Sequence, residues 1–254
     1  MAHIDENFVS ANGIKSQPPL FVERRLLDDL GFTIQSELGS GHCSAVYQAL
    51  YQNRPIALKI GRQLQKEVDH LKIAHEMQIG PALIMHTVLR AQTDCFPSFS
   101  SSSSSSSSTS PSRGAVERSA PIDVIAMEKL DYTLQQLIEQ DRLGTHSITA
   151  LYDLARRCFD NNFCHRDLHT GNIMRETRNG SSFRLIDFSP STFGQDRQSK
   201  KAIFEEWRAL FYHVKGKTPS HNVDVHMALA AAIRRIETEW LSFYQARSYN
   251  RRRR

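Results

Sequence analysis

The sequence predicts an α+β fold in two parts, a group of strands with one helix followed by a shorter, mainly helical part. Strand patterns occupy residues 32–60 and return at 82–89 and 122–127, and one helical pattern lies between them at 63–78. Beyond residue 130 the apolar side chains follow the 3.6-residue period of helices. A chain of 254 residues that is 40 % hydrophobic can bury a core in one large domain or in two lobes.

An N-terminal extension, residues 1–31, precedes the first strand pattern. It is polar and irregular as far as Pro19, and the segment Phe21–Leu27 then predicts a short helix. The next segment places apolar strand residues on both sides of the turn Gly39-Ser40-Gly41. These flanking residues are Phe32, Ile34, Val46 and Tyr47.

A lysine stands in the middle of the next apolar strand, Ile56–Ile60. Burying Lys59 is costly unless it is paired with an anion. Glu67 is the candidate partner, because it lies on the apolar stripe of the helix predicted at 63–78. Glu76 is the alternative, but it lies near the end of that helix. The apolar stripe consists of Leu64, Leu71 and Ala74.

A serine-rich insertion, about residues 92–121, separates the strand patterns at 82–89 and 122–127. It contains an unbroken serine run from Ser100 to Ser108. A segment with so few apolar side chains cannot bury enough surface to order itself, so we expect a disordered surface loop.

The mainly helical part carries a group of oxygen-donor side chains. Helical stripes at 134–138 and 148–158 lead into the loop His165–Asn172, and two short strands joined through Asn179-Gly180 follow it. Asp167, Asn172 and Asp187 then provide two carboxylates and one carboxamide. These groups suit phosphoryl transfer, which needs a carboxylate to orient a hydroxyl and hard oxygen ligands for magnesium. Two further helices are predicted at 204–212 and 227–243.

These motifs resemble those of the protein kinase-like superfamily. His165–Asn172 matches the catalytic-loop pattern H-R-D-L-x-x-x-N, and Asp187-Phe188-Ser189 resembles D-F-G. Leu38–Tyr47 resembles the glycine-rich hairpin, and Ile56–Ile60 resembles V-A-I-K. The resemblance covers residues 32–188 apart from the insertion. It implies a bilobal fold, with an antiparallel sheet and one helix in an N-lobe at 32–130 and a truncated helical C-lobe at 131–250. A basic tail at 251–254 follows these lobes in the sequence.

The resemblance also implies a set of site residues with ATP and Mg²⁺ as cofactors, Mn²⁺ being an alternative metal. Asp167 would orient the hydroxyl and accept its proton, and Lys59, held by Glu67, would position the phosphates. Asn172 and Asp187 would bind the metal, and Met127 would stand at the gatekeeper position with the backbone of Glu128 and Leu130 facing adenine. The other expected nucleotide-binding residues are Gly39, Ser40, Gly41, Ser44, Val46 and Ala57.

Departures from the family pattern bear on substrate and activity. Serine replaces glycine at Ser44 and Ser189, His169 stands where serine/threonine kinases carry lysine, and the sequence has no A-P-E motif. The short second part is similar to RIO and lipopolysaccharide-kinase-like enzymes and to compact kinases delivered into host cells by some bacteria and viruses. We expect transfer to serine or threonine hydroxyls of proteins. The alternatives are an aminoglycoside- or sugar-type phosphotransferase, since D-L-H-x-G-N also resembles these enzymes, and a nucleotide-binding pseudokinase.

Charge and composition give the remaining expectations. Arg251–Arg254 contributes four of the five net positive charges, so this tail could contact an anionic surface or remain a solvated terminus. Nothing else indicates nucleic-acid binding. The polar start and the absence of an apolar run of about 20 residues argue against a secretory signal or membrane span. The four cysteines form no C-x-x-C pair and suggest free thiols in the cytoplasm, or in host cytoplasm or nucleus if the source is a pathogen.

Overall fold

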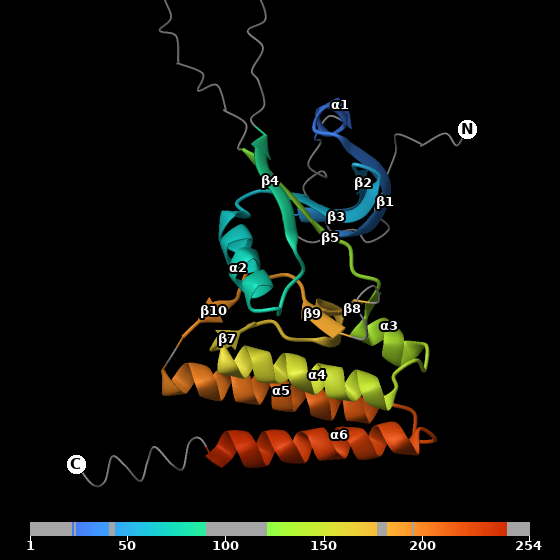
Figure 1. The fold of residues 1–254 in the computed structure, drawn as a ribbon, viewed down its shortest axis with the longest axis vertical. Coiled ribbons are helices and arrows are strands. Elements are labelled where there is room, and N and C mark those ends of the chain that lie inside the picture. Colours follow the sequence, from blue (N-terminus) through green and yellow to red (C-terminus); the bar gives the residue numbers. More distant parts are fainter. Residues whose placement is uncertain are drawn as a thin grey trace, which may run out of the picture.

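The structure, a computed structural model, describes residues 22, 24–40, 44–89, 121–176, 182–194 and 196–242. It confirms the α+β class expected from the sequence. Figure 1 shows the sheet with α1 and α2 at one end of the molecule and a group of helices at the other. Most of the expected N-terminal extension, the serine-rich insertion, the turn Asn179-Gly180 and the basic tail lie outside the described residues.

A five-stranded antiparallel sheet forms the first part, in the order β1-β2-β3-β5-β4. Helix α1 precedes the sheet, and helix α2 connects β3 to β4. The elements are α1 (Arg24–Asp29), β1 (Phe32–Ser40), β2 (Ser44–Tyr51), β3 (Arg54–Gly61), α2 (Gln65–Glu76), β4 (Leu83–Leu89) and β5 (Ile122–Glu128). Their bounds agree with the expected strands and helices to within a few residues.

The two faces of this sheet have different neighbours because side chains alternate along each strand. One face is apolar and packs with Leu27 of α1, forming a separate core around Phe32 and Leu58. On the opposite face Ile125 and Met127 join the larger core, which includes Val68 and Leu71 of α2. Lys59 is directly opposite Ile125 in the register, so it lies on the face that meets α2.

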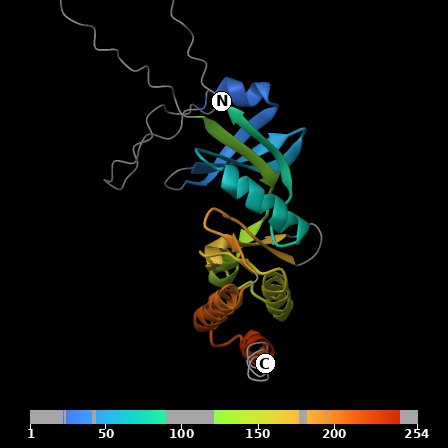
Figure 2. The same cartoon turned by 90° about the vertical axis from the view of Figure 1, so that its left-hand side faces the viewer.

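The second part consists of helices with short strands between them. Figures 1 and 2 show α4 and α5 side by side, with α6 beneath them, at the end of the molecule away from the sheet. The helices are α3 (Leu134–Glu139), α4 (Thr145–Asp160), α5 (Arg197–Lys217), α6 (Val223–Arg235), a 3₁₀ turn η1 (Thr170–Asn172) and a π-helical turn η2 (Ile236–Trp240). The strands are β6 (Tyr132–Thr133), β7 (Phe163–Cys164), β8 (Ile173–Glu176), β9 (Ser182–Leu185) and β10 (Thr192–Phe193).

The expected bounds of the last two helices were wrong. The helix expected at 204–212 is the much longer α5, which starts at residue 197 because the Asp196 carboxylate accepts a hydrogen bond of 2.7 Å from the Ser199 N–H and caps the helix. The helix expected at 227–243 starts at Val223, and Phe243 lies outside the described residues. Among the helices that the structure describes, none has the length and apolar character needed to cross a membrane.

Phe188 contacts both parts, because its carbonyl lies 3.1 Å from His70 Nδ1 of α2 and its ring packs on Phe163 of β7. Its side chain is buried, and its ring lies 5.9 Å from the ring of Phe163. Gly80, at the turn between α2 and β4, passes so close that a Cβ atom there would lie 2.8 Å from Phe188 Cζ and 3.1 Å from Ala74 Cβ. This turn therefore requires glycine for space.

Replacing Gly80 by alanine should lower the free energy of unfolding by about 1–3 kcal/mol, because the added methyl group overpacks the contact with Phe188. Urea denaturation would measure the change. Gly216→Ala is the matched control, because a Cβ at Gly216 meets nothing within 4 Å and alanine favours the helix by about 0.5–1 kcal/mol. Equal stability changes in the two variants would contradict the packing argument.

Candidate active site

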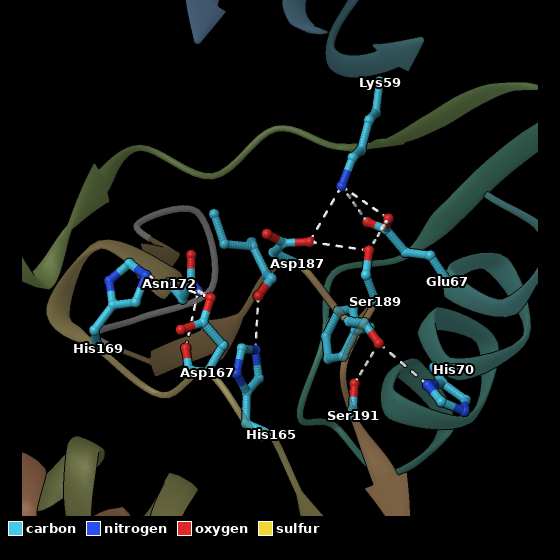
Figure 3. A network of polar contacts seen from close by, with 12 residues as sticks. Lys59, Glu67, His70, His165, Asp167, His169, Asn172, Asp187, Ser189 and Ser191 are labelled. Carbon is cyan, nitrogen blue, oxygen red and sulfur yellow. Dashed lines mark hydrogen bonds and ion pairs between the residues drawn. The ribbon is translucent and has the colours of Figure 1, made fainter. Parts of the chain in front are cut away.

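Lys59 and Glu67 form the buried ion pair expected from the sequence. Lys59 Nζ lies 2.7 Å from Glu67 Oε1 and 2.8 Å from Glu67 Oε2, and the two residues are 8 % and 4 % exposed. Lys59 Nζ also donates to Asp187 Oδ1 at 3.3 Å, across 128 residues of sequence. Figure 3 shows the lysine side chain descending from β3 toward these two carboxylates. The pairing explains how the apolar strand and the apolar helix stripe each accommodate a charge.

The loop between β7 and β8 carries Asp167 and Asn172. The Asn172 carboxamide donates to the Asp167 backbone carbonyl at 3.0 Å and to Asp167 Oδ2 at 3.4 Å. The backbone carbonyl of Asn172 accepts from the Ile186 N–H at 3.0 Å, which brings this loop beside Asp187. Side chains expected from the sequence to share one site therefore do lie together, as Figure 3 shows.

His165 connects the Asp167 loop to the backbone just before Asp187. Its Nε2 atom lies 2.8 Å from the Ile186 carbonyl, and since a carbonyl only accepts, Nε2 carries the proton. His165 Nδ1 is buried without a hydrogen-bond partner within the described residues. The imidazole thus serves as a single donor that ties the Asp167 loop to the residue before Asp187.

Two residues of the site hold a left-handed backbone conformation. Arg166 has φ 69° and Asp187 has φ 61°, values that cost free energy in non-glycine residues. Such strain persists only where surrounding contacts enforce it and is concentrated at functional sites. With this backbone, the Asp167 side chain faces solvent and is 58 % exposed, and the Asp187 side chain faces Lys59.

Glu206 of α5 is a site residue that the sequence analysis did not identify. Its Oε2 and Oε1 atoms accept from the backbone N–H groups of His165 at 3.2 Å and Arg166 at 2.8 Å. Burial, and to a smaller extent the Glu206 carboxylate, raises the pKa of the Cys164 thiol to about 12. A signal was present, because Glu206 lies three residues after Ile203 and four before Leu210 on the apolar stripe of α5.

Glu206→Gln should lower the free energy of unfolding by about 1–3 kcal/mol, because the amide offers one oxygen and turns N–H groups toward a backbone N–H donor. The backbone of the His165–Asn172 loop should then shift, and any activity of the site should fall with it. Chemical denaturation would measure the stability. Glu205→Gln is the control, because Glu205 is exposed and its ion pair with Arg208 is a long one of 3.6 Å. A change in the free energy of unfolding above about 0.5 kcal/mol in this control would contradict the comparison.

The expected nucleotide-binding residues share one region of the sheet. Val46 is opposite Lys59 in the register, and Ala57 is opposite Met127, so all four lie on the face that meets α2. Gly39 and Ser40 end β1 and Ser44 begins β2, whereas Gly41 lies outside the described residues.

Backbone groups in the segment after β5 are open to a ligand among the residues that the structure describes. The Glu128 N–H donates to the Ala82 carbonyl at 2.9 Å, toward β4. Leu130 has a buried side chain, and neither its N–H nor its carbonyl has a hydrogen-bond partner among the residues that the structure describes. This backbone can therefore pair with a flat polar ligand that enters beside Met127 and Ala57.

Asn172 and Asp187 have the right donor atoms for a hard cation. Asn172 uses its amide N–H groups on Asp167, which leaves its Oδ1 atom for another partner. Asp187 uses Oδ1 toward Lys59, and within the described residues its Oδ2 atom has no partner. One carboxylate and one carboxamide oxygen fit Mg²⁺, which takes few protein ligands and completes its shell with water and phosphate oxygens. No cluster of three or more His, Cys, Asp or Glu side chains suited to a metal occurs in the described part of the chain.

His169 lies beside Asp167 in a defined tautomer. Its Nδ1 atom accepts the Gly171 N–H at 3.1 Å, so the proton of the neutral ring is on Nε2. That Nε2 atom lies 3.9 Å from Asp167 Oδ2. His169 therefore presents an N–H donor at the edge of the site.

The described cysteines, Cys158 and Cys164, are free and buried. Burial raises the pKa of the Cys158 thiol and of the Cys164 thiol, so both remain protonated and unreactive at neutral pH. They belong to the core rather than to the site. Cys43 and Cys95 lie outside the described residues.

The chain matches no protein-family model and no curated protein. The arrangement of Lys59, Glu67, Asp167, Asn172 and Asp187 is therefore the basis for any conclusion on function.

Proposed function

We propose that the chain is an ATP- and Mg²⁺-dependent protein kinase with a bilobal protein kinase-like fold, acting on serine or threonine hydroxyls. One observation carries the proposal, namely that Lys59 contacts both Glu67 and Asp187 while Asp187 adjoins the Asp167–Asn172 loop. A five-stranded antiparallel sheet with one helix, followed by helices, agrees with the expected lobes. These groups match the parts that kinases use to hold phosphates and metal.

Each residue has a role that its contacts support. Lys59, oriented by Glu67, would donate to the phosphates, and the backbone at residues 39–44 would cover them. Asp167 is solvent-exposed and would accept the proton of the attacking hydroxyl while orienting it. Asn172 and Asp187 would hold Mg²⁺, which when bound neutralises charge on the phosphate oxygens.

Protein hydroxyls are the favoured acceptors because Asp167 lies in an open setting rather than in a closed pocket. Arg166 is also exposed, and its Nε atom donates to Thr192 Oγ1 at 3.1 Å, which ties the loop to the segment after Asp187. That segment pairs with β7 through β10. The Nε2–H of His169 would donate toward the transferred phosphate, in place of the lysine of serine/threonine kinases.

The test is phosphate transfer from γ-labelled ATP with Mg²⁺, using the wild-type chain beside Asp167→Asn. Casein, histone and myelin basic protein would serve as protein acceptors, and kanamycin, choline and glucose as small ones. We expect wild type alone to label proteins, with the label on serine or threonine after acid hydrolysis. Equal labelling by the variant would refute the proposed mechanism.

Two other outcomes would assign a different function. Labelling of a small acceptor without protein labelling would identify a small-molecule phosphotransferase. His169 in the D-L-H-x-G-N pattern favours this alternative. A Mg²⁺-dependent thermal shift with ATP, but no transfer to any acceptor, would make it a nucleotide-binding pseudokinase.

A further inference from the structure

Ser189 occupies the position where the related metal motif carries glycine, and its hydroxyl is engaged. Ser189 Oγ lies 2.8 Å from Glu67 Oε2 and 3.3 Å from Asp187 Oδ1. Figure 3 shows the hydroxyl between these two carboxylates, on the side opposite Lys59. The serine therefore contacts two of the three acceptor oxygens that Lys59 contacts.

The four groups form a closed ring of contacts. Lys59 Nζ and Ser189 Oγ each lie 2.8 Å from Glu67 Oε2 and 3.3 Å from Asp187 Oδ1. The ammonium can donate to both oxygens, whereas the hydroxyl has one hydrogen and donates it to Glu67 Oε2, the shorter contact. Two carboxylates held this close repel each other unless donors bridge them. Lys59 supplies the charge, and the serine hydroxyl supplies a further donor that a glycine would lack.

The backbone shows why serine is tolerated here. The positive-φ residue of this segment is Asp187, whereas Ser189 is absent from the left-handed region and needs none of the freedom of glycine. Ser189 is also solvent-exposed, so its side chain displaces no core atom. The described part of the structure therefore accommodates a side chain at this position.

A second contact joins the same two elements. His70, one helical turn after Glu67, lies with Nδ1 3.1 Å from the Phe188 carbonyl, so Nδ1 carries the proton. The His70 ring also packs edge-on against Phe193, with ring centroids 5.5 Å apart. Helix α2 is thus attached to residues 188–193 by its side chains at two successive turns.

We infer that Ser189 is a positioning residue, which ties α2 to the metal-binding segment and keeps Glu67 and Asp187 assembled before any ligand binds. When Lys59 turns N–H groups toward a nucleotide, the serine hydroxyl continues to satisfy Glu67 Oε2 and holds the helix in place. The tie itself is independent of the proposed function. Its consequence for metal binding rests on that function.

The experiment compares wild type with Ser189→Ala, which removes only the hydroxyl, and Ser189→Thr, which restores it. Ser182→Ala is the matched control, because the Ser182 hydroxyl also donates to a carboxylate, Glu176 Oε2 at 3.0 Å, and neither residue belongs to α2. The first readout is amide hydrogen exchange of residues 65–76 in the ligand-free protein. The second is the Mg²⁺ concentration that half-saturates ATP binding, followed by thermal shift.

In Ser189→Ala the amide hydrogens of α2 should exchange roughly tenfold faster, and half-saturation of ATP binding should need roughly tenfold more Mg²⁺. Both changes are the size expected for one lost hydrogen bond to a charged group. Ser189→Thr should return both values to within about threefold of wild type, and Ser182→Ala should leave both unchanged. Unchanged exchange in Ser189→Ala would overturn the inference. Faster exchange in a protein that binds no Mg²⁺-ATP, even as wild type, would support the tie and overturn the proposed function instead.

Discussion

Asp167→Asn should reduce the rate of phosphate transfer by roughly 10²–10⁴-fold, the usual contribution of a positioned general base. The amide keeps the shape of the side chain and one oxygen, so the contact with Asn172 Nδ2 at 3.4 Å can persist. It cannot accept a proton from the attacking hydroxyl. Because Asp167 is exposed and makes no contact with Lys59, the variant should bind Mg²⁺-ATP and fold like wild type. Initial rates at saturating ATP would measure the loss.

Asp160→Asn is the control for removing one surface carboxylate. Asp160 is on α4, its side chain is 62 % exposed, and its contact is a 3.6 Å ion pair with Arg156. Its rate should match wild type, since exposed pairs of this kind contribute little. An Asp167→Asn variant that keeps more than about a tenth of the wild-type rate would exclude proton acceptance at Asp167 as the basis of catalysis.

The Lys59–Glu67 pair was predictable because burial of charge leaves a trace in the sequence. A lysine inside an apolar strand and a glutamate on an apolar helix stripe each indicate a buried partner of opposite charge. Strands and helices were likewise recognisable from the period of their apolar residues. The contact of Lys59 with Asp187 was not predicted, because no local pattern relates residues 128 positions apart.

Glu206 and Ser189 show where sequence reasoning falls short. Glu206 accepts from backbone N–H groups, which every residue carries, so its partners leave no trace in the sequence. The helix expected at 204–212 was also too short to reveal the stripe that contains Glu206, since the cap at Asp196 was not recognised. At Ser189 the sequence showed only that glycine was missing. The meaning of the hydroxyl depends on how α2 meets the segment after Asp187.

Lys59→Met should lower the free energy of unfolding by about 3–5 kcal/mol, the cost of leaving a buried charge without its partner. Glu67 is 4 % exposed and would lose a contact of 2.7 Å, while Asp187 would lose the cation that separates the two carboxylates. Methionine fills most of the lysine volume, so the loss reflects charge rather than a cavity. Mg²⁺-ATP binding should be lost as well, because the phosphates lose their lysine. Urea denaturation would measure the stability.

A second substitution separates the charge effect from a general weakness of the strand. In Lys59→Met/Glu67→Leu the unpaired carboxylate is gone, so most of the lost stability should return although the ion pair is absent. Nucleotide binding should not return, because the lysine is still missing. Lys72→Met, at an exposed position of α2, should change the stability by less than about 0.5 kcal/mol. If the double variant were as unstable as Lys59→Met, the penalty would arise from packing in β3, and the buried carboxylate would not be its cause.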